Sequence, residues 1–101
     1  MKTARLVQIL LPTTETSKSS SVFEELAQEL TARFGGVTSY IHSPAEGRWK
    51  IGRRTEHDDI TVIEVMTDKV DPKYWKALRG ELERKLGQEE IIIRSQLLQR
   101  L

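Results

Sequence analysis

The sequence predicts an α+β fold with the element order β-α-β-β-α-β. Three observations lead to this prediction: two amphipathic helical segments that each end at glycine, a β-branched run after each of them, and a pair of strand-like runs between the helices. We expect one domain over residues 1–101, because this length can bury a core without a disulfide or a metal.

The first helix is expected at residues 22–34. Ser21 and Glu24 have the spacing of a capping box, and Gly35-Gly36 permits a left-handed stop. The apolar residues of this segment recur at helical spacing and predict one buried face: Phe23, Leu26, Ala27, Leu30 and Phe34.

The second helix is expected at residues 72–86. Asp71 is a favourable N-cap, Pro72 suits the first helical position, and Gly87 closes the segment. Its apolar stripe consists of Trp75, Leu78, Leu82 and Leu86. Gly80 weakens this helix by about 1 kcal/mol relative to alanine, which suggests a close approach to a neighbouring element.

Four strands are expected before, between and after these helices in the sequence. Pro12 is expected to stop the first strand, and a polar loop is expected at residues 52–58. The leucine-rich tail at 96–101 is expected to be ordered, because disordered ends favour polar residues. The expected strands are 4–11, 37–42 with a continuation at 48–51 beyond Pro44 and Gly47, 60–66 and 90–94.

Composition excludes several classes of function. The 16 basic and 15 acidic side chains give a net charge of +1, which offers no electrostatic argument for nucleic acid or an anionic membrane. The apolar runs are too short to span a bilayer, and no signal peptide is recognisable. No cysteine is present, which removes disulfides and thiolate chemistry. We therefore expect a cytoplasmic protein without a cofactor.

The two faces of the predicted sheet differ, because successive strand side chains alternate. An almost purely apolar set is assigned to the helix side: Val7, Ile9, Leu11, Val37, Ile41, Ile63, Val65, Ile91 and Ile93. The second face mixes apolar and polar residues: Leu6, Gln8, Leu10, Tyr40, His42, Ile60, Val62, Glu64, Met66, Ile92, Arg94 and Gln96. An open apolar face usually marks an interface, so we expect a homodimer packed sheet against sheet.

The element order and the apolar second face resemble the dimeric α+β barrel superfamily of ferredoxin-like proteins. Residues 33–38, together with Gly47 and Trp49, also look like small bacterial proteins of unknown function. The superfamily resemblance covers nearly the whole chain and implies a dimer. Such barrels include cofactor-free monooxygenases, isomerases and ligand sensors, but no motif matches residue by residue, so no catalytic residue is carried over.

In ferredoxin-like folds the four strands, numbered along the chain, have the order 4-1-3-2. That order would bring Arg94, Gln8, Glu64 and the Tyr40/His42 pair into one polar belt, our candidate ligand-binding site. Two interpretations stay open. Glu64 and Arg94 either pair at a dimer interface, or they act as acid, base or ligand anchors.

Trp49 is a further candidate ligand-binding residue, since it lies between Arg48 and Lys50 and could stack on a ligand. The alternative is a core lid or an interface anchor. His42 is either a general base or a hydrogen-bonded residue at a strand end. We expect no metal site, because residues 56–59 are more typical of a solvated turn.

Two functions follow from these features. The first is a small homodimer that binds a small molecule or a protein partner without catalysis. The alternative is a cofactor-independent enzyme acting on a small organic substrate, with the belt residues as its working groups. Nucleic-acid binding through the basic hairpin is less favoured, because the sheet strands lack the aromatic residues of RNA-binding sheets. That hairpin carries Arg48, Lys50, Arg53 and Arg54.

Overall fold

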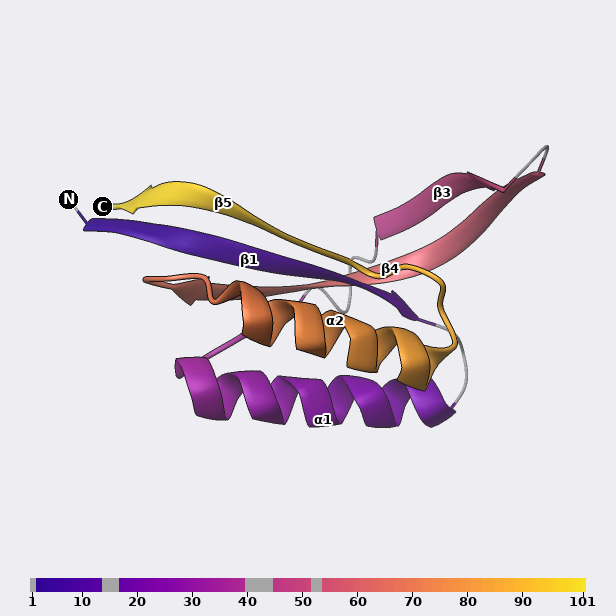
Figure 1. Cartoon of the computed structure of the whole chain (residues 1–101), viewed down its shortest axis with the longest axis horizontal. Helices are drawn as coiled ribbons and strands as arrows, with labels where there is room; N and C mark the ends of the chain where they lie inside the picture. The colour runs from indigo at the N-terminus through magenta and orange to yellow at the C-terminus, as the bar shows by residue number, and fades with distance from the viewer. Residues whose placement is uncertain (1, 14–16, 40–44, 52–53) are drawn as a thin grey trace.

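The computed structural model of the chain describes residues 2–13, 17–39, 45–51 and 54–101. Two helices lie on one face of an antiparallel sheet (Figure 1). The α+β, ferredoxin-like βαββαβ fold expected from the sequence is confirmed. The elements are β1 (Lys2–Thr13), α1 (Ser17–Phe34), β2 (Thr38–Ser39), β3 (Ala45–Ile51), β4 (Arg54–Thr67), α2 (Pro72–Leu86) and β5 (Ile92–Arg100).

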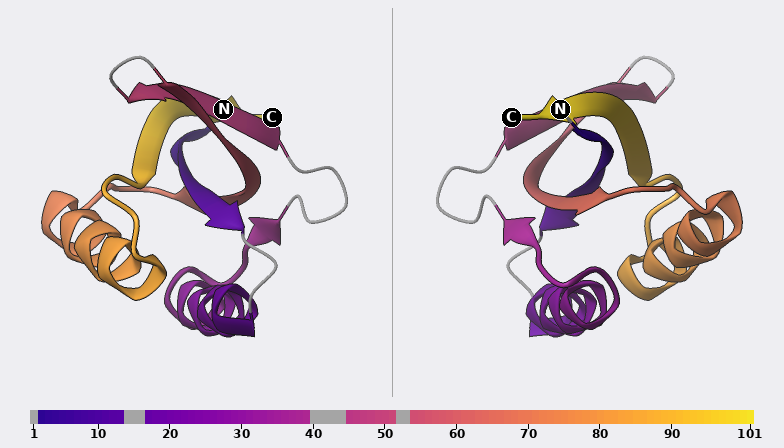
Figure 2. Two further views of the ribbon diagram at one scale, coloured as in Figure 1. Left: turned by 90° about the vertical axis from the view of Figure 1, so that its right-hand side faces the viewer. Right: turned by 90° about the vertical axis from the view of Figure 1, so that its left-hand side faces the viewer.

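Strand β1 is the centre of the sheet, whose order is β2-β4-β1-β5. Residues 5–13 of β1 pair with β4, and residues 2–10 pair with β5, both antiparallel. Figure 2 shows the strongly twisted strands above the two helices. The observed order agrees with the 4-1-3-2 order that the resemblance implied.

The polar loop expected at residues 52–58 is wrong from residue 54 onward. Strand β4 begins at Arg54 and pairs with β3, from Ile51 opposite Arg54 to Ala45 opposite Ile60. This two-stranded ribbon extends beyond the helices (Figure 1). Because the ribbon does not lie over the helix layer, its strands need no alternation of apolar and polar residues. Their polar composition is therefore the same as that expected of a loop. Of the strand expected at 37–42, the described residues contain β2 at Thr38–Ser39; residues 40–42 lie outside them.

Helix α1 begins at Ser17, four residues before the expected cap, so the capping box at Ser21 and Glu24 is wrong. The buried face of this helix also begins earlier than expected. Val22 is buried together with Leu26 and Leu30, at four-residue spacing, and this stripe begins one residue before the predicted one. Serine costs a helix only a few tenths of a kcal/mol per residue, so the serines of this segment do not prevent the longer helix.

Proline does not stop β1, contrary to expectation. Pro12 is buried within the strand and lies opposite Ile60 of β4. The pairing of β1 with β5 has already ended at Leu10, so this part of β1 has one neighbour only, where a missing N–H is tolerated.

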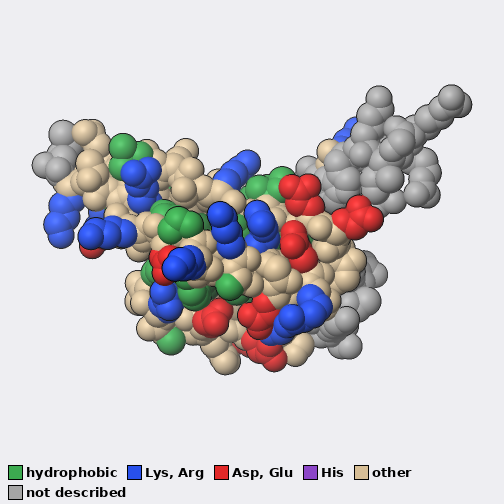
Figure 3. All heavy atoms as spheres, in the orientation of Figure 1, with side chains coloured by type: hydrophobic (Ala, Val, Ile, Leu, Met, Phe, Trp, Pro, Cys, Tyr) green, Lys and Arg blue, Asp and Glu red, His purple; other side chains and the backbone are tan. Residues whose placement is uncertain are grey.

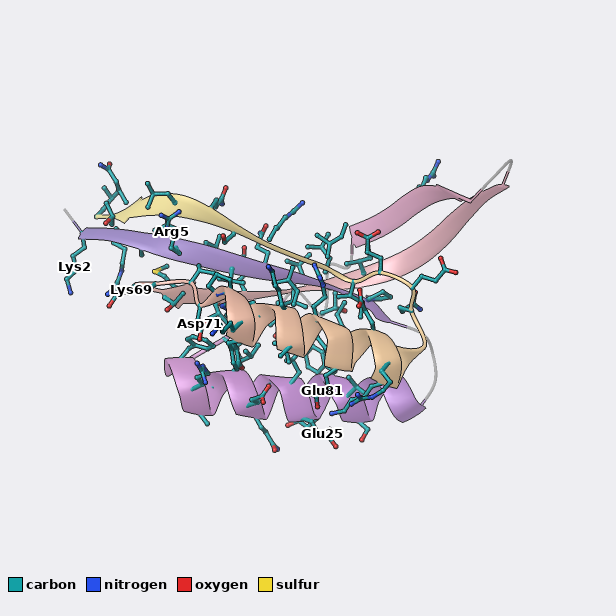
Figure 4. The ribbon with its side chains drawn as sticks, in the orientation of Figure 1. Lys2, Arg5, Glu25, Lys69, Asp71 and Glu81 are labelled. Carbon is teal, nitrogen blue, oxygen red and sulfur yellow. The ribbon has the colours of Figure 1, made fainter. Side chains whose placement is uncertain are left out.

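Helix α2 agrees with its prediction residue by residue. The Asp71 side chain accepts a hydrogen bond from the Lys73 N–H at 3.1 Å, and Gly87 adopts the left-handed conformation at φ 64°. Its N–H bonds back to the Arg84 carbonyl. At the outer surface, Lys85 forms ion pairs with Glu81 at 2.8 Å and with Glu25 of α1 at 3.5 Å; Figure 4 labels both acids.

The core lies between the sheet and the helices, as the strand alternation predicted. Val37 and Ile93 pack at its border, and Ile41 lies outside the described residues. The core consists of Val7, Ile9, Leu11, Val22, Leu26, Leu30, Ile63, Val65, Trp75, Leu78, Leu82 and Ile91.

The C-terminal tail is ordered, as expected, but for another reason. Strand β5 continues to Arg100 through backbone pairing with β1. Leu98 is half-buried opposite Ala4, whereas Leu97 and Leu101 are exposed. Backbone pairing rather than leucine packing therefore orders the tail.

Gly80 has no close neighbour, so the expected close approach is wrong. A Cβ placed there would meet nothing within 4 Å, and the residue is an exposed helical glycine. Gly80→Ala should therefore raise the free energy of unfolding by about 1 kcal/mol through helix propensity. Denaturant melts would measure the gain; a loss of stability would contradict the open surroundings of this residue.

Truncation after Ser95 should lower the melting temperature, because it removes the part of β5 that pairs with residues 2–6 of β1. Removal of Leu101 alone, which pairs with nothing in the sheet, is the matched control. Thermal melts of the two truncations should differ clearly. Equal melting temperatures would show that the pairing of residues 96–100 with β1 contributes nothing to stability.

Candidate functional site

Three of the predicted site residues form one hydrogen-bonded line across the second sheet face. Gln8 lies opposite Glu64 of β4 and opposite Arg94 of β5. The Gln8 Nε2 donates to Glu64 Oε2 at 2.7 Å, and Arg94 Nε donates to Gln8 Oε1 at 2.9 Å. We call Glu64, Gln8 and Arg94 the polar row.

Gln8 is the central residue of the polar row. Within one chain Glu64 and Arg94 are not direct neighbours, because β1 lies between their strands, as the expected strand order implied. The Gln8 amide connects them instead, and its two ends suit the charges: the NH₂ group faces the carboxylate and the carbonyl faces the guanidinium. The row therefore has a negative end at β4 and a positive end at β5.

Apolar side chains surround the polar row. Leu6, Leu10 and Val62 are half-buried on the same face, and Met66 and Ile92 keep 46% and 49% of their surface exposed. No helix of the described chain covers this face (Figure 1). The expected mixture of apolar and polar groups on the second face is therefore present among the described side chains.

The other predicted site residues stay predictions. Tyr40 and His42 lie outside the described residues, as does the side chain of Trp49, whose backbone pairs with Glu56 in the β3–β4 ribbon. In the described part of β2, Thr38 lies opposite Glu64 and extends the line of the polar row toward the sheet edge.

A surface cavity of about 660 Å³, widely open to solvent, adjoins the polar row at the end of the sheet where β1 begins. Glu64 belongs to both. The sequence reasoning did not identify the cavity, although residues 33–38, which carried part of the resemblance, form one of its walls. Its lining consists of Ala4, Arg33, Phe34, Gly35, Gly36, Val37, Thr38, Glu64, Met66, Thr67, Asp68 and Arg100.

An aromatic cluster supports this wall. The Arg33 guanidinium carbon lies 3.8 Å from the centre of the Tyr74 ring, and the Phe34 ring stacks on Trp75 at 5.3 Å. Burial raises the pKa of Tyr74, the nearby Glu29 carboxylate raises it further, and the positive charge of Arg33 opposes both. Phe34 and Arg33 are thus held in place from the helix side.

The described residues contain no group of three or more His, Cys, Asp or Glu side chains that could hold a metal ion. None of the helices described is long and apolar enough to cross a membrane.

No protein-family model matches the chain, and a search of curated proteins found no match. Solved structures do share its fold. The periplasmic divalent cation tolerance protein CutA from Archaeoglobus fulgidus is 12% identical, with a TM-score of 0.59 over 96% of this chain and 85% of that one. CutA from Synechococcus elongatus is 13% identical, with a TM-score of 0.58 over 100% and 80%.

A phage SAM lyase in complex with S-methyl-5′-thioadenosine is similar to the same degree. It is 16% identical, with a TM-score of 0.58 over 93% of this chain and 79% of that one. Identities this low show the fold alone. They support the ferredoxin-like part of the resemblance, and membership of the dimeric α+β barrel superfamily stays a hypothesis.

Replacing Gln8, the centre of the polar row, should show that Gln8 and Glu64 contribute to stability together. Gln8→Leu removes both hydrogen bonds and leaves Glu64 in a half-buried, more apolar setting, which should cost about 1–2 kcal/mol. Combining Gln8→Leu with Glu64→Leu should cost less than the sum of the single losses, by about 1 kcal/mol. Denaturant melts of the double-mutant cycle would measure this coupling.

The matched control pairs Gln8→Leu with Arg79→Met, an exposed residue on α2. These two losses should add. Simple additivity of the Gln8 and Glu64 losses as well would show that the row does not act as a unit.

Proposed function

We propose that the protein is a cytoplasmic homodimer that binds a small molecule or a protein partner through its second sheet face, without catalysis. The observation that carries the proposal is this face itself. It presents apolar groups around a dipolar polar row, with Met66 and Ile92 about half exposed. Apolar surface of this kind favours association at roughly 25 cal/mol per Å² buried.

The charges of the polar row suit a two-fold contact. A two-fold axis that lies between the two sheets, parallel to their planes and running along β1 at Gln8, would reverse the row of one protomer relative to its partner. Glu64 of each protomer would then approach the partner's Arg94, while the apolar groups cover one another. The negative end of each row would thus face the positive end of the partner's row. A row that carried charges of one sign only would repel its partner instead.

The cavity beside Glu64 favours a second candidate function, a cofactor-independent enzyme for a small organic substrate. Glu64 is the carboxylate shared by the cavity and the row, so it would be the acid or base. Turnover that Glu64→Gln abolishes, with folding retained, would favour the enzyme over the binding protein.

Light scattering at micromolar concentration tests the dimer. The expected mass is twice 11.6 kDa. Ile92→Glu should give the monomer, because it places a charge within the proposed interface. Leu97→Glu is the matched control, since Leu97 is 61% exposed but lies on the opposite face of β5 by register.

A monomeric wild type would refute the proposed dimer. So would a Leu97→Glu variant that dissociates while Ile92→Glu stays dimeric, since the contact would then use the other face.

A further inference from the structure

The cavity at the end of the sheet has the size of a ligand site. Its volume of about 660 Å³ lies within the range of small-molecule pockets. Its walls come from the end of α1 with the residues that follow it, from the end of β4 with the residue after it, and from the two chain ends in β1 and β5. Figure 1 shows these segments at the same end of the molecule, where both termini lie.

Opposite charges line this cavity in equal number. Arg33 and Arg100 contribute two guanidinium groups, and Glu64 and Asp68 contribute two carboxylates. The last carbonyls of α1 carry the partial negative charge of a helix C-terminus, which the guanidinium of Arg33 in the last turn offsets. A simple anion would meet both carboxylates and a simple cation both guanidiniums, so neither matches the walls.

Arg33 is positioned before any ligand arrives. Its guanidinium lies over the Tyr74 ring at 3.8 Å and near the Phe34 ring at 5.6 Å. Contact through the flat face of a guanidinium leaves its N–H groups directed in the plane, where they can grip a carboxylate. Less side-chain entropy is then lost on binding.

More positive charge surrounds this end of the molecule. Figure 3 shows Lys and Arg side chains gathered there, and Figure 4 labels Lys2, Arg5 and Lys69 beside the start of β1. These residues do not line the cavity, but their field would attract a carboxylate toward it. The remaining walls combine polar groups, among them Thr38 and Thr67, with a smaller apolar part whose largest side chains are Phe34 and Met66.

We propose that this cavity binds a small zwitterion of the α-amino-acid type with an apolar side group. The carboxylate lies near Arg33 and Arg100, the ammonium group lies near Glu64 and Asp68, and the side group packs against Phe34 and Met66. This inference rests on the small-molecule part of the proposed function and names its ligand class. It does not require the dimer. Light scattering can therefore refute the dimer while the ligand titration supports the zwitterion site, and the reverse.

Three matched probes test the zwitterion: L-phenylalanine, phenethylamine, which lacks the carboxylate, and 3-phenylpropanoate, which lacks the ammonium group. Each is titrated into the ¹⁵N-labelled full chain, and amide shifts are followed by NMR. L-Phenylalanine should bind at least threefold more tightly than either analogue, with shifts centred on residues 35–38 and 66–68. Equal or weaker binding of L-phenylalanine, or shifts elsewhere, would overturn the proposal.

Two exposed wall residues then test the polarity of the site. Arg100→Gln should weaken L-phenylalanine and 3-phenylpropanoate by roughly threefold and leave phenethylamine unchanged. Asp68→Asn should weaken L-phenylalanine and phenethylamine and leave 3-phenylpropanoate unchanged. Arg84→Gln, on α2 and away from the cavity, is the charge-matched control and should change none of them. The same response of all three probes to both wall variants would refute the assigned orientation.

Discussion

The pairing of β1 on both sides is the constraint on which the rest of the structure depends. It fixes the register of β4 and β5 at once, so that one set of alternating residues enters the core and the other lies on the second face. Val7 and Ile9 pack against the helices, while Gln8 between them reaches both neighbouring strands. A slip of one residue would place Gln8 in the core and dismantle the polar row at the same time.

Those parts of the fold that carry a local signal could be predicted from the sequence. Helix α2 has Asp71, Pro72 and Gly87 at its ends, each with its own backbone reason, and its bounds were correct. Helix α1 carried a misleading start signal, because Ser21 and Glu24 have capping-box spacing but the helix begins at Ser17. The β3–β4 ribbon was missed for the opposite reason: a strand pair that does not lie over the helices needs no apolar alternation.

The candidate site divides in the same way. Gln8, Glu64 and Arg94 could be predicted, since strand alternation and strand order are enough to align them. The cavity could not, because residues distant in the sequence form it: the glycines after α1 meet Ala4 and Arg100 from the two chain ends. The residue pattern of a single segment does not predict which distant segments line a cavity together.

Glu64 connects the polar row with the cavity, which gives the two proposals a shared physical consequence. A dimer contact would place the partner's guanidinium near this carboxylate, and a bound ammonium group would approach it from the cavity. Both contacts stabilise the negative charge of Glu64. Once one of them has formed, the other therefore gains less free energy from this carboxylate. Binding free energies are reciprocal, and a ligand that loosens the dimer must itself bind more tightly to the monomer. Ligand affinity that is independent of protein concentration would mean that Glu64 serves one of the two contacts and not both.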